Sequence, residues 1–312
     1  MKIAHISDLH FTTFFRKNNL DKIRQLLKYA FECKFDHMVI SGDLTHNADQ
    51  EDFEILRELF KEYGFLNSER LSLVIGNHDI FGGPLTAEDV FLFPEKCKLV
   101  DYDKKVNEFG SYFSETFEYC SKIAKDKYFP YVKKLNEILI IGLNSNEKYS
   151  KLNNPFASNG KIYTDDYNFL ANVLGKYYIE PVKKLIVVHH HFNKIKVDKS
   201  KSDSSFWQNI EKQTMKLKKK KRLFQLFKMY GVDLVLHGHV HETQEYFRKG
   251  IRFLNAGSSV MGVIPDELKI NFINIKNSKI NIETHKIIYN PSLILNNQID
   301  TTNNKLYSII NN

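Results

Sequence analysis

The chain of 312 residues has few cysteines and only one tryptophan. The cysteines, Cys33, Cys97 and Cys120, are odd in number, far apart and never spaced C-x-x-C, which argues against a disulfide framework and against a thiolate zinc site. No run of about 18 apolar residues occurs, and the first residues, MKIAHISDLH, contain no apolar signal-peptide core. We therefore expect a cytoplasmic protein that does not span a membrane.

The composition is that of a globular protein, with 42% hydrophobic and 26% charged residues. Its length predicts one α/β domain, which we place at residues 1–285, followed by a C-terminal tail at 286–312. The net charge is +8, and the densest basic run is MKLKKKKR at residues 215–222. Such a run on a predicted helix is typical of a solvated face, and the alternative is a patch that attracts a phosphate-bearing partner.

Short apolar runs alternate with amphipathic segments, which indicates βαβ units and a largely parallel inner sheet. The expected strands lie at 2–7, 37–41, 71–75, 137–145, 183–191 and 232–239. The expected helices lie at 18–33, 50–64, 164–177 and 206–230. Residues 81–135 are rich in aromatic and charged residues, and we expect them to form a cap or insertion over the sheet edge.

The last third of the chain changes to period-two alternation, which is typical of antiparallel hairpins. We expect one hairpin to turn at Lys249 and Gly250 and a second to turn near Asn277 and Ser278. Antiparallel strands that follow βαβ units predict two stacked sheets flanked by helices. In open α/β sheets the carboxyl ends of the strands gather along one edge and form the ligand crevice.

Five of the predicted strands run into oxygen or imidazole donors at this edge. The polar ends are Ser7, Asp8 and His10; Asp43; Asn77, His78 and Asp79; His189, His190 and His191; and His239 and His241. Among them, two aspartates, an asparagine and four or more histidines, without a thiolate, form a mixed set of oxygen and nitrogen ligands that suits Mn²⁺, Fe or Zn²⁺. Seven ligands exceed the needs of one ion, whereas two ions that share a carboxylate use them all, clamp a phosphoryl group and convert a bridging water into hydroxide.

Each of these motifs by itself arises easily by chance. The chain also places His5, His37, His46 and His237 where they have no evident role. Five motifs in order, each at a predicted strand end, are much more specific than any one of them.

The order D-x-H, G-D, G-N-H-D, H and G-H-x-H over residues 1–285 resembles the calcineurin-like metallophosphoesterase superfamily. The resemblance implies a four-layer αββα sandwich of two stacked mixed sheets, with a dinuclear metal site at the C-terminal ends of the strands. It also implies hydrolysis of a phosphomonoester or phosphodiester. Carried over residue by residue, it assigns Asp8, His10, Asp43 and His241 to one metal and Asn77, His189 and His239 to the other, with Asp43 as the bridge.

The same resemblance implies catalytic roles in the third block. Asn77 and His78 are expected to contact the substrate phosphate, and His78 to protonate the leaving oxygen. Asp79 is expected to orient His78, as a carboxylate beside an imidazole does in general acid–base catalysis. The fourth block departs from the H-H-P-P of many relatives, because this chain has VVHHHFNK. His189 is the expected ligand there, with His190 as the alternative.

Chain length and the HHHF block look most like the bacterial cyclic-nucleotide phosphodiesterase branch, which implies a small phosphodiester substrate. One alternative is a DNA nuclease of the double-strand-break-repair type, which the basic run favours but which has little chain left here for its capping domain. A second is a lipid-precursor pyrophosphatase, for which the 206–230 helix is a loose match to a membrane-contacting surface. The third is a non-catalytic scaffold similar to the retromer subunit, which predicts gaps in the ligand set where none is seen.

Overall fold

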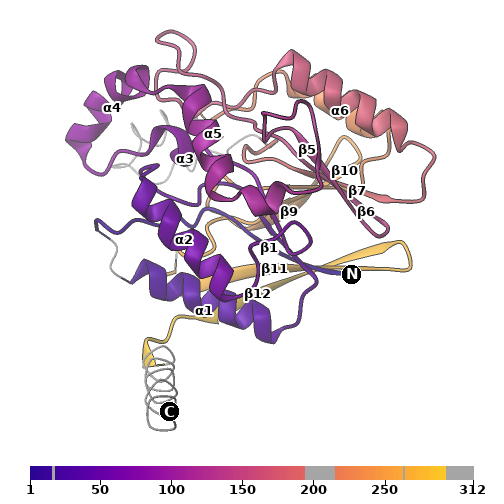
Figure 1. Cartoon of the computed structure of the whole chain (residues 1–312), viewed down its shortest axis with the longest axis horizontal. Coiled ribbons are helices and arrows are strands. Elements are labelled where there is room, and N and C mark those ends of the chain that lie inside the picture. Colours follow the sequence, from indigo (N-terminus) through magenta and orange to yellow (C-terminus); the bar gives the residue numbers. More distant parts are fainter. Residues whose placement is uncertain (16–17, 194–214, 263, 293–312) are drawn as a thin grey trace, which may run out of the picture.

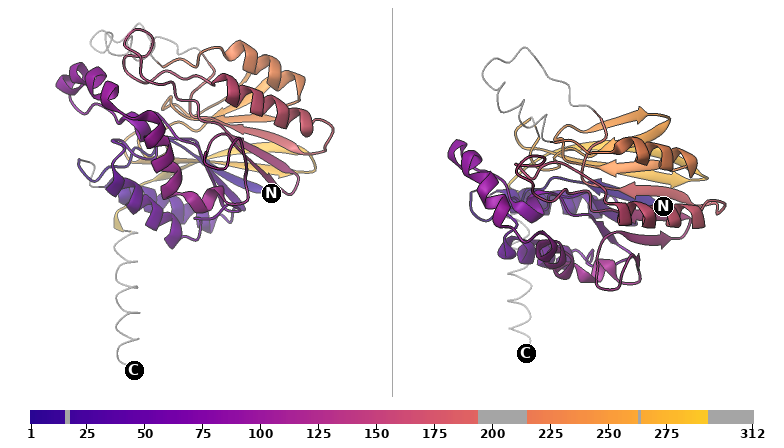
Figure 2. Two further views of the ribbon diagram at one scale, coloured as in Figure 1. Left: turned by 45° about the horizontal axis from the view of Figure 1, so that its top comes forward. Right: turned by 90° about the horizontal axis from the view of Figure 1, so that it is seen from above.

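The computed structural model describes residues 1–15, 18–193, 215–262 and 264–292. These residues form two β-sheets that are stacked on each other, and Figures 1 and 2 show helices on both sides of the pair. The predicted α/β sandwich of four αββα layers is therefore confirmed. Within the described ranges no helix has the length and apolar character needed to cross a membrane.

The first sheet has five strands in the order β12-β11-β1-β2-β3. Strands β1, β2 and β3 are parallel, and the β11–β12 hairpin joins antiparallel to β1. The strands are β1 (Lys2–Ile6), β2 (His37–Ile40), β3 (Leu71–Leu73), β11 (Glu267–Lys276) and β12 (Lys279–Ile288). The crossover helices are α1 (Asn19–Glu32) and α2 (Gln50–Glu62). Each buries an apolar stripe with the three- and four-residue spacing of an amphipathic helix.

The second sheet has seven strands in the order β4-β5-β6-β7-β8-β10-β9. Its parallel centre is flanked by antiparallel strands at both edges. The strands are β4 (Ser121–Lys122), β5 (Tyr131–Leu135), β6 (Ile138–Gly142), β7 (Lys183–Val187), β8 (Leu234–His237), β9 (Gln244–Arg248) and β10 (Ile251–Asn255). Helices α6 (Thr164–Lys176) and α8 (Lys220–Met229) pack on its outer face.

Strand β6 shows how one apolar run serves two cores. Ile138 and Ile140 belong to the core between the sheets, whereas Leu139 and Ile141 belong to the core beneath α6 and α8. Successive side chains of a strand point to opposite faces. Because both faces are covered, the strand is a continuous apolar run rather than an alternating one.

Residues 78–117 form a group of helices that follows β3. They are α3 (His78–Phe81), α4 (Ala87–Leu99), α5 (Tyr102–Tyr112) and a 3-10 helix, η1 (Ser114–Phe117). Helix α5 packs on α2 and α3, and its Phe109 contacts Phe53 of α2 edge to face. The segment 81–135 therefore places helices beside the start of α3 and supplies two strands of the second sheet, β4 and β5.

Side chains from β5 cover the free edge of β3, which is the last strand of its sheet. The Tyr131 hydroxyl donates to the carbonyl of Leu73 at 3.0 Å, and the Lys133 ammonium donates to the carbonyl of Leu71. These donors replace the missing neighbour strand and satisfy buried carbonyls. They also connect the two sheets, because β5 lies in the second one.

The predicted hairpins are confirmed, but the predicted helix over 206–230 is corrected. Residues 206–214 lie outside the described part of the chain, and α8 begins only at Lys220. Leu217 pairs with Gly160 in a short parallel bridge, and Lys219 has a positive φ of 55°, which lies outside the right-handed helical region. A tertiary backbone contact here overrides helix propensity. The basic run is accordingly not one helical face.

Candidate metal centre

The predicted ligand residues meet at the C-terminal ends of five strands. Asp8 and His10 follow β1, Asp43 follows β2, Asn77 follows β3, His189 follows β7, and His239 and His241 follow β8. The first sheet therefore carries four of these residues and the second sheet carries three. The candidate centre lies where the two sheets meet at this edge.

Two groups of ligand atoms form there, each with all its atoms within 4.8 Å of one another. One group is Asp8, His10 and His241, and the other is Asp43, His189 and His239. Asp43 Oδ2 lies 3.8 Å from His10 Nε2 and 3.2 Å from His189 Nε2, so this one carboxylate lies close to a member of each group. That placement is the one expected of a carboxylate shared by two ions.

Hydrogen bonds fix which nitrogen of His189 faces the centre. Its Nδ1 donates to the carbonyl of Ser41 at 3.0 Å, which leaves Nε2 as the lone-pair nitrogen, 3.1 Å from Asn77 Oδ1. His239 Nδ1 lies 3.0 Å from the same Nε2. Such an outer hydrogen bond sets tautomer and ring orientation in metal-binding histidines.

The neighbouring His190 is engaged elsewhere. Its Nδ1 hydrogen-bonds with Ser145 Oγ at 2.8 Å, and its Nε2 lies 3.2 Å from the carbonyl of Ser158. Both ring nitrogens therefore hold the loop that follows β6. Between the two histidines that the sequence left open, the geometry favours His189 as the ligand.

The backbone is strained at four of the candidate ligands. Asp8, His10, Asp43 and His239 have positive φ values of 52°, 43°, 51° and 72°. This region is uncommon for residues other than glycine, and holding a residue there costs about 1–3 kcal/mol. Strain collected at one site, where the surrounding fold maintains it, indicates a functional constraint on these side chains.

Two glycines of the motifs allow close packing around the carboxylates. A Cβ on Gly76 would lie 2.1 Å from Asp43 Oδ1, and one on Gly238 would lie 2.2 Å from Asp8 Oδ2. No side chain fits at those distances. The glycines of G-N-H-D and G-H-x-H are therefore needed for close approach to the two aspartates.

The charges of the cluster suit a cation. Burial raises the pKa of Asp8 to about 7. Although burial opposes it, the adjacent His189 and His78 hold the pKa of Asp43 well below its usual range. Burial, followed by neighbouring imidazoles, keeps the pKa values of His10 and His239 well below the ordinary histidine value.

His189 differs from these histidines, because the adjacent Asp43 and Asp8, against the effect of burial, raise its pKa to about 9. Metals bind neutral imidazoles and ionised carboxylates, so a cation here would displace the protons held by His189 and Asp8. A divalent cation among them would offset the cost of burying the carboxylates. The donor set, its spacing and its charge therefore fit divalent metal ions.

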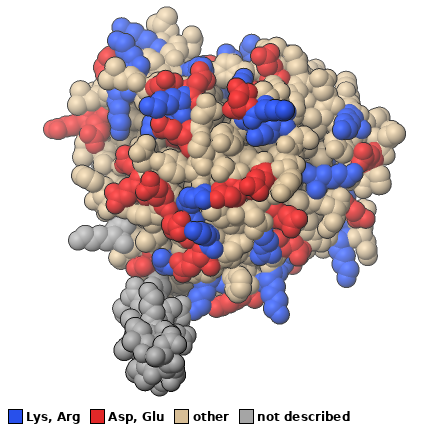
Figure 3. Space-filling view, in the orientation of Figure 1, with Lys and Arg blue, Asp and Glu red and all other residues tan. Residues whose placement is uncertain are grey.

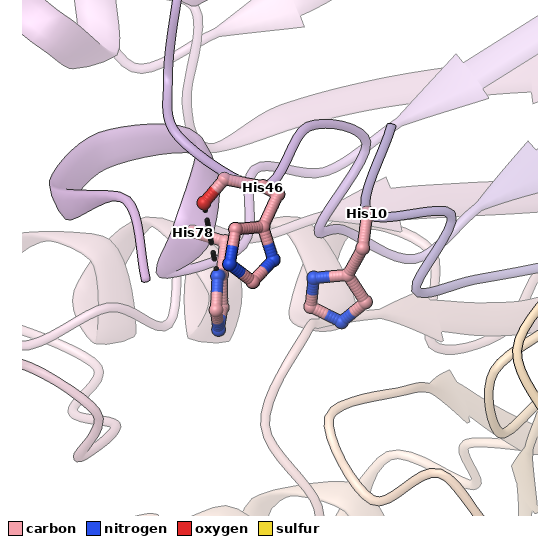
Figure 4. A group of neighbouring side chains, drawn as sticks. All are labelled: His10, His46 and His78. Atoms are coloured by element: carbon pink, nitrogen blue, oxygen red, sulfur yellow. Dashed lines mark hydrogen bonds between the residues drawn. The ribbon is translucent and has the colours of Figure 1, made fainter. Parts of the chain in front are cut away.

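His78 lies beside this cluster at the start of α3. Figure 4 shows its ring next to those of His46 and His10, and the ring centroids of His78 and His10 are 4.5 Å apart. His78 Nδ1 donates to the carbonyl of His46 at 3.1 Å, so Nε2 is the nitrogen left for other partners.

The carboxylate of Asp79 does not make the contact with His78 that we expected. It accepts hydrogen bonds from the backbone N–H groups of Thr45, at 2.8 Å, and Gly76, at 2.9 Å. Asp79 therefore holds together the two loops that carry His46 and His78. The group bonded to the His78 ring is the carbonyl of His46, so orientation of His78 by Asp79 would act through these loops.

Two residues of the site were missed by the sequence analysis. His46 had no assigned role, yet its ring lies 4.9 Å from that of His78. Asn146 is buried, and its amide donates to the carbonyl of Ile75 at 2.9 Å, next to the G-N-H-D loop. The signal for Asn146 was available, since N-S-N follows β6 in the same way that the ligand motifs follow their strands.

Comparison with known proteins agrees with this geometry. Residues 1–243 match the family of calcineurin-like phosphoesterases, and the chain belongs to that family. It is thereby a member of a superfamily of metal-dependent phosphoric ester hydrolases. No curated protein matches the chain in sequence.

Solved structures show the same fold at low sequence identity. A dimetal phosphatase from Danio rerio is 12% identical with a TM-score of 0.62, and the match covers 93% of this chain and 99% of that one. A purple acid phosphatase from yellow lupin seeds (Lupinus luteus) is 14% identical with a TM-score of 0.56, over 93% of this chain and 52% of the lupin chain. At such identities the likeness concerns the fold.

Proposed function

We propose that this protein hydrolyses a small phosphodiester similar to a cyclic nucleotide, using two divalent metal ions such as Mn²⁺, Fe or Zn²⁺. Asp8, His10, Asp43 and His241 would hold one ion, and Asn77, His189 and His239 the other. The observation that carries this proposal is the position of Asp43, whose Oδ2 lies 3.8 Å from His10 Nε2 and 3.2 Å from His189 Nε2. When bound, two such ions supply positive charge for the phosphoryl oxygens and lower the pKa of a water nucleophile.

In this proposal His78 is the general acid. The carbonyl of His46 fixes its Nδ1–H, so the proton that leaves is the one on Nε2. Delivery of that proton to the departing oxygen avoids release of an alkoxide, and such catalysis contributes about 10²- to 10⁴-fold to a rate. Asn77, one residue earlier, would contact the same phosphate.

Asp79 has a positioning role in this proposal. It fastens Thr45 to Gly76 and so keeps the His46 carbonyl opposite the His78 ring. The preference for a diester rests on the resemblance of the fourth block and of chain length to the cyclic-nucleotide branch. A cytoplasmic location, which the unpaired cysteines favour, stays a prediction.

The face of the molecule seen in Figure 3 offers little support for nucleic-acid binding. Lysine and arginine side chains are interspersed there with aspartate and glutamate. Several basic groups of the described residues form ion pairs, as Arg57 does with Glu115. A nuclease would be expected to gather basic groups along a phosphate path.

The first test is hydrolysis by metal-stripped protein after Mn²⁺ is added back. The substrates are bis(p-nitrophenyl) phosphate, p-nitrophenyl phosphate, 3′,5′-cyclic AMP and a single-stranded DNA oligonucleotide. Metal-dependent turnover that is fastest on the two small diesters supports the proposal. A preference for the monoester or for DNA would overturn the substrate class, and no turnover with two metals bound would favour the scaffold.

Variants separate the proposed roles. Asp43→Ala should lose bound metal and activity together, whereas His78→Ala should keep both metals and lose about 100-fold or more in kcat. His285→Ala is the matched control, because this histidine lies on β12 and hydrogen-bonds with Tyr29. Metal content, measured by mass spectrometry, and kcat are determined on the same samples. A fully active Asp43→Ala variant would contradict the proposal of a dinuclear centre.

A further inference from the structure

A third group of potential metal ligands lies beside the two already described. It consists of His10, His46 and His78, whose ligand atoms all lie within 4.8 Å of one another. Figure 4 shows the three rings side by side, His10 from the segment after β1, His46 from the loop after β2 and His78 from the start of α3. This group contains imidazoles only, whereas each of the other two contains a carboxylate.

The nitrogens of His10 and His78 are disposed for such a site. His78 gives Nδ1 to the carbonyl of His46, which leaves Nε2 for a ligand. His10 places Nε2 3.1 Å from His241 Nε2, within the first group. Its Nδ1 is buried and makes no hydrogen bond with the described residues, and in Figure 4 a ring nitrogen of His10 faces His46.

The rings are already close enough for small movements to complete the site. The ring centroids are 4.5 Å apart for His10 and His78, 4.9 Å for His46 and His78, and 5.7 Å for His10 and His46. Zinc–nitrogen bonds of about 2.0–2.1 Å place tetrahedral ligand nitrogens about 3.4 Å apart. Nitrogens that now lie within 4.8 Å of one another must therefore approach by up to about 1.4 Å to bind one zinc ion.

The chemistry of the group selects the ion. Imidazole ligands suit Zn²⁺, Cu²⁺, Fe and Ni²⁺, whereas Mn²⁺ and Mg²⁺ prefer carboxylate, carbonyl and water oxygens. A site with three imidazoles and no carboxylate will therefore take zinc and leave manganese in solution. The fourth position of a tetrahedral zinc ion would be open to water or to a phosphate oxygen.

We propose that His10, His46 and His78 form a third, zinc-selective site that shuts the enzyme off. Zinc there occupies His78 Nε2, so this nitrogen can no longer carry a proton to a leaving oxygen. His10 binds it through Nδ1, and the proton of that nitrogen is released to solvent. The inhibitory consequence rests on the proposed function of His78, whereas the zinc site itself rests on the geometry of the three rings.

The test measures zinc binding and inhibition separately. Full-length protein loaded with Mn²⁺ is dialysed against buffered free Zn²⁺, and bound manganese and zinc are counted by mass spectrometry. Co²⁺ is used in parallel, because tetrahedral coordination gives it intense visible absorption. Wild-type protein should bind three metal ions in total, because zinc can also replace manganese in the dinuclear centre, and binding of the third ion should coincide with loss of hydrolysis of bis(p-nitrophenyl) phosphate.

Two variants and a control make the assignment specific. His46→Phe keeps an aromatic ring against Phe15, with which His46 makes an edge-to-face contact, but has no ligand atom. His46→Gln serves as a second variant if the first one folds poorly. Both should weaken the third zinc ion at least tenfold and raise the inhibitory zinc concentration equally, whereas His285→Gln should change neither.

The outcomes are distinct. A third zinc ion that binds as tightly to both His46 variants as to wild type overturns the site, and so does the absence of any third ion. If zinc binds as described but the manganese enzyme hydrolyses no substrate, the proposed function fails and the zinc site stands. Zinc that binds at His46 without slowing hydrolysis would overturn the inhibitory role.

Discussion

Replacing Lys133 by methionine should change how the stability of the protein depends on pH. Lys133 is buried between the sheets, where its ammonium donates to the Leu71 carbonyl of β3. Burial lowers the pKa of Lys133 from 10.5 to about 8. The groups around Lys133 include Tyr131, His37 and Cys120. Burial, together with the charge of Lys133, lowers the pKa of His37 to about 3, so His37 stays neutral over this pH range.

The sign follows from proton binding. Between pH 8 and 10.5 the unfolded chain holds the Lys133 proton and the folded chain releases it, so stability rises with pH across this window. Below pH 8 both states are charged and the full cost of burying the charge is present. The fall in pKa from 10.5 to about 8 means that the buried charge lowers the free energy of unfolding by about 3 kcal/mol. About 2 kcal/mol of this loss is regained as the pH rises from 7.5 to 10.

The assay is urea unfolding followed by circular dichroism at several pH values from 7.5 to 10. The free energy of unfolding of wild type minus that of Lys133→Met should rise by about 2 kcal/mol over this range. Lys134→Met is the matched control, because Lys134 is exposed, pairs with Glu180 at 2.7 Å and has a raised pKa, so its difference should stay flat. A flat difference for Lys133→Met as well would refute the buried-charge reasoning.

Three further predictions concern the metal centre. His190→Ala should lower the free energy of unfolding, measured in urea, by about 2–4 kcal/mol, because the His190 ring hydrogen-bonds with Ser145 and with the carbonyl of Ser158. The folded fraction of this variant should keep its metals, and loss of metal would instead make His190 a ligand. Asn146→Ala should lower kcat about tenfold and leave the metal content unchanged, because it removes the hydrogen bond to the Ile75 carbonyl beside the G-N-H-D loop. An unchanged kcat would show that Asn146 does not position this loop. Chelation should lower the unfolding midpoint, and added Mn²⁺ should restore it in proportion to the logarithm of its concentration, which a thermal-shift series checks.

Much of the site could be predicted from the sequence because its residues interrupt the hydrophobic pattern. A buried run that ends in Asp8 and His10, or in Asn77 and His78, breaks a rule that core strands otherwise follow. Parallel strands then bring such ends to one edge, so the convergence follows from topology. The residue types predict the chemistry without any knowledge of distances.

The residues that were missed or corrected depend on loop conformation. His46 reaches the centre because the chain turns sharply at Asp43, whose φ is 51°, and no periodicity in the sequence signals that turn. Asp79 adjoins His78 in sequence but binds Thr45 and Gly76 in space. The late start of α8 depends on Leu217 meeting Gly160, a contact between segments far apart in the chain.

The division of the ligands between two sheets has a consequence for how the protein is made. Asp8, His10, Asp43 and Asn77 leave the ribosome early, but His189, His239 and His241 follow only after more than a hundred further residues. Neither half contains the full set, so a nascent or truncated chain that ends before β8 lacks two of the proposed ligands, His239 and His241. In the proposed dinuclear centre, metal loading would therefore be complete only after the strands of both sheets are in place.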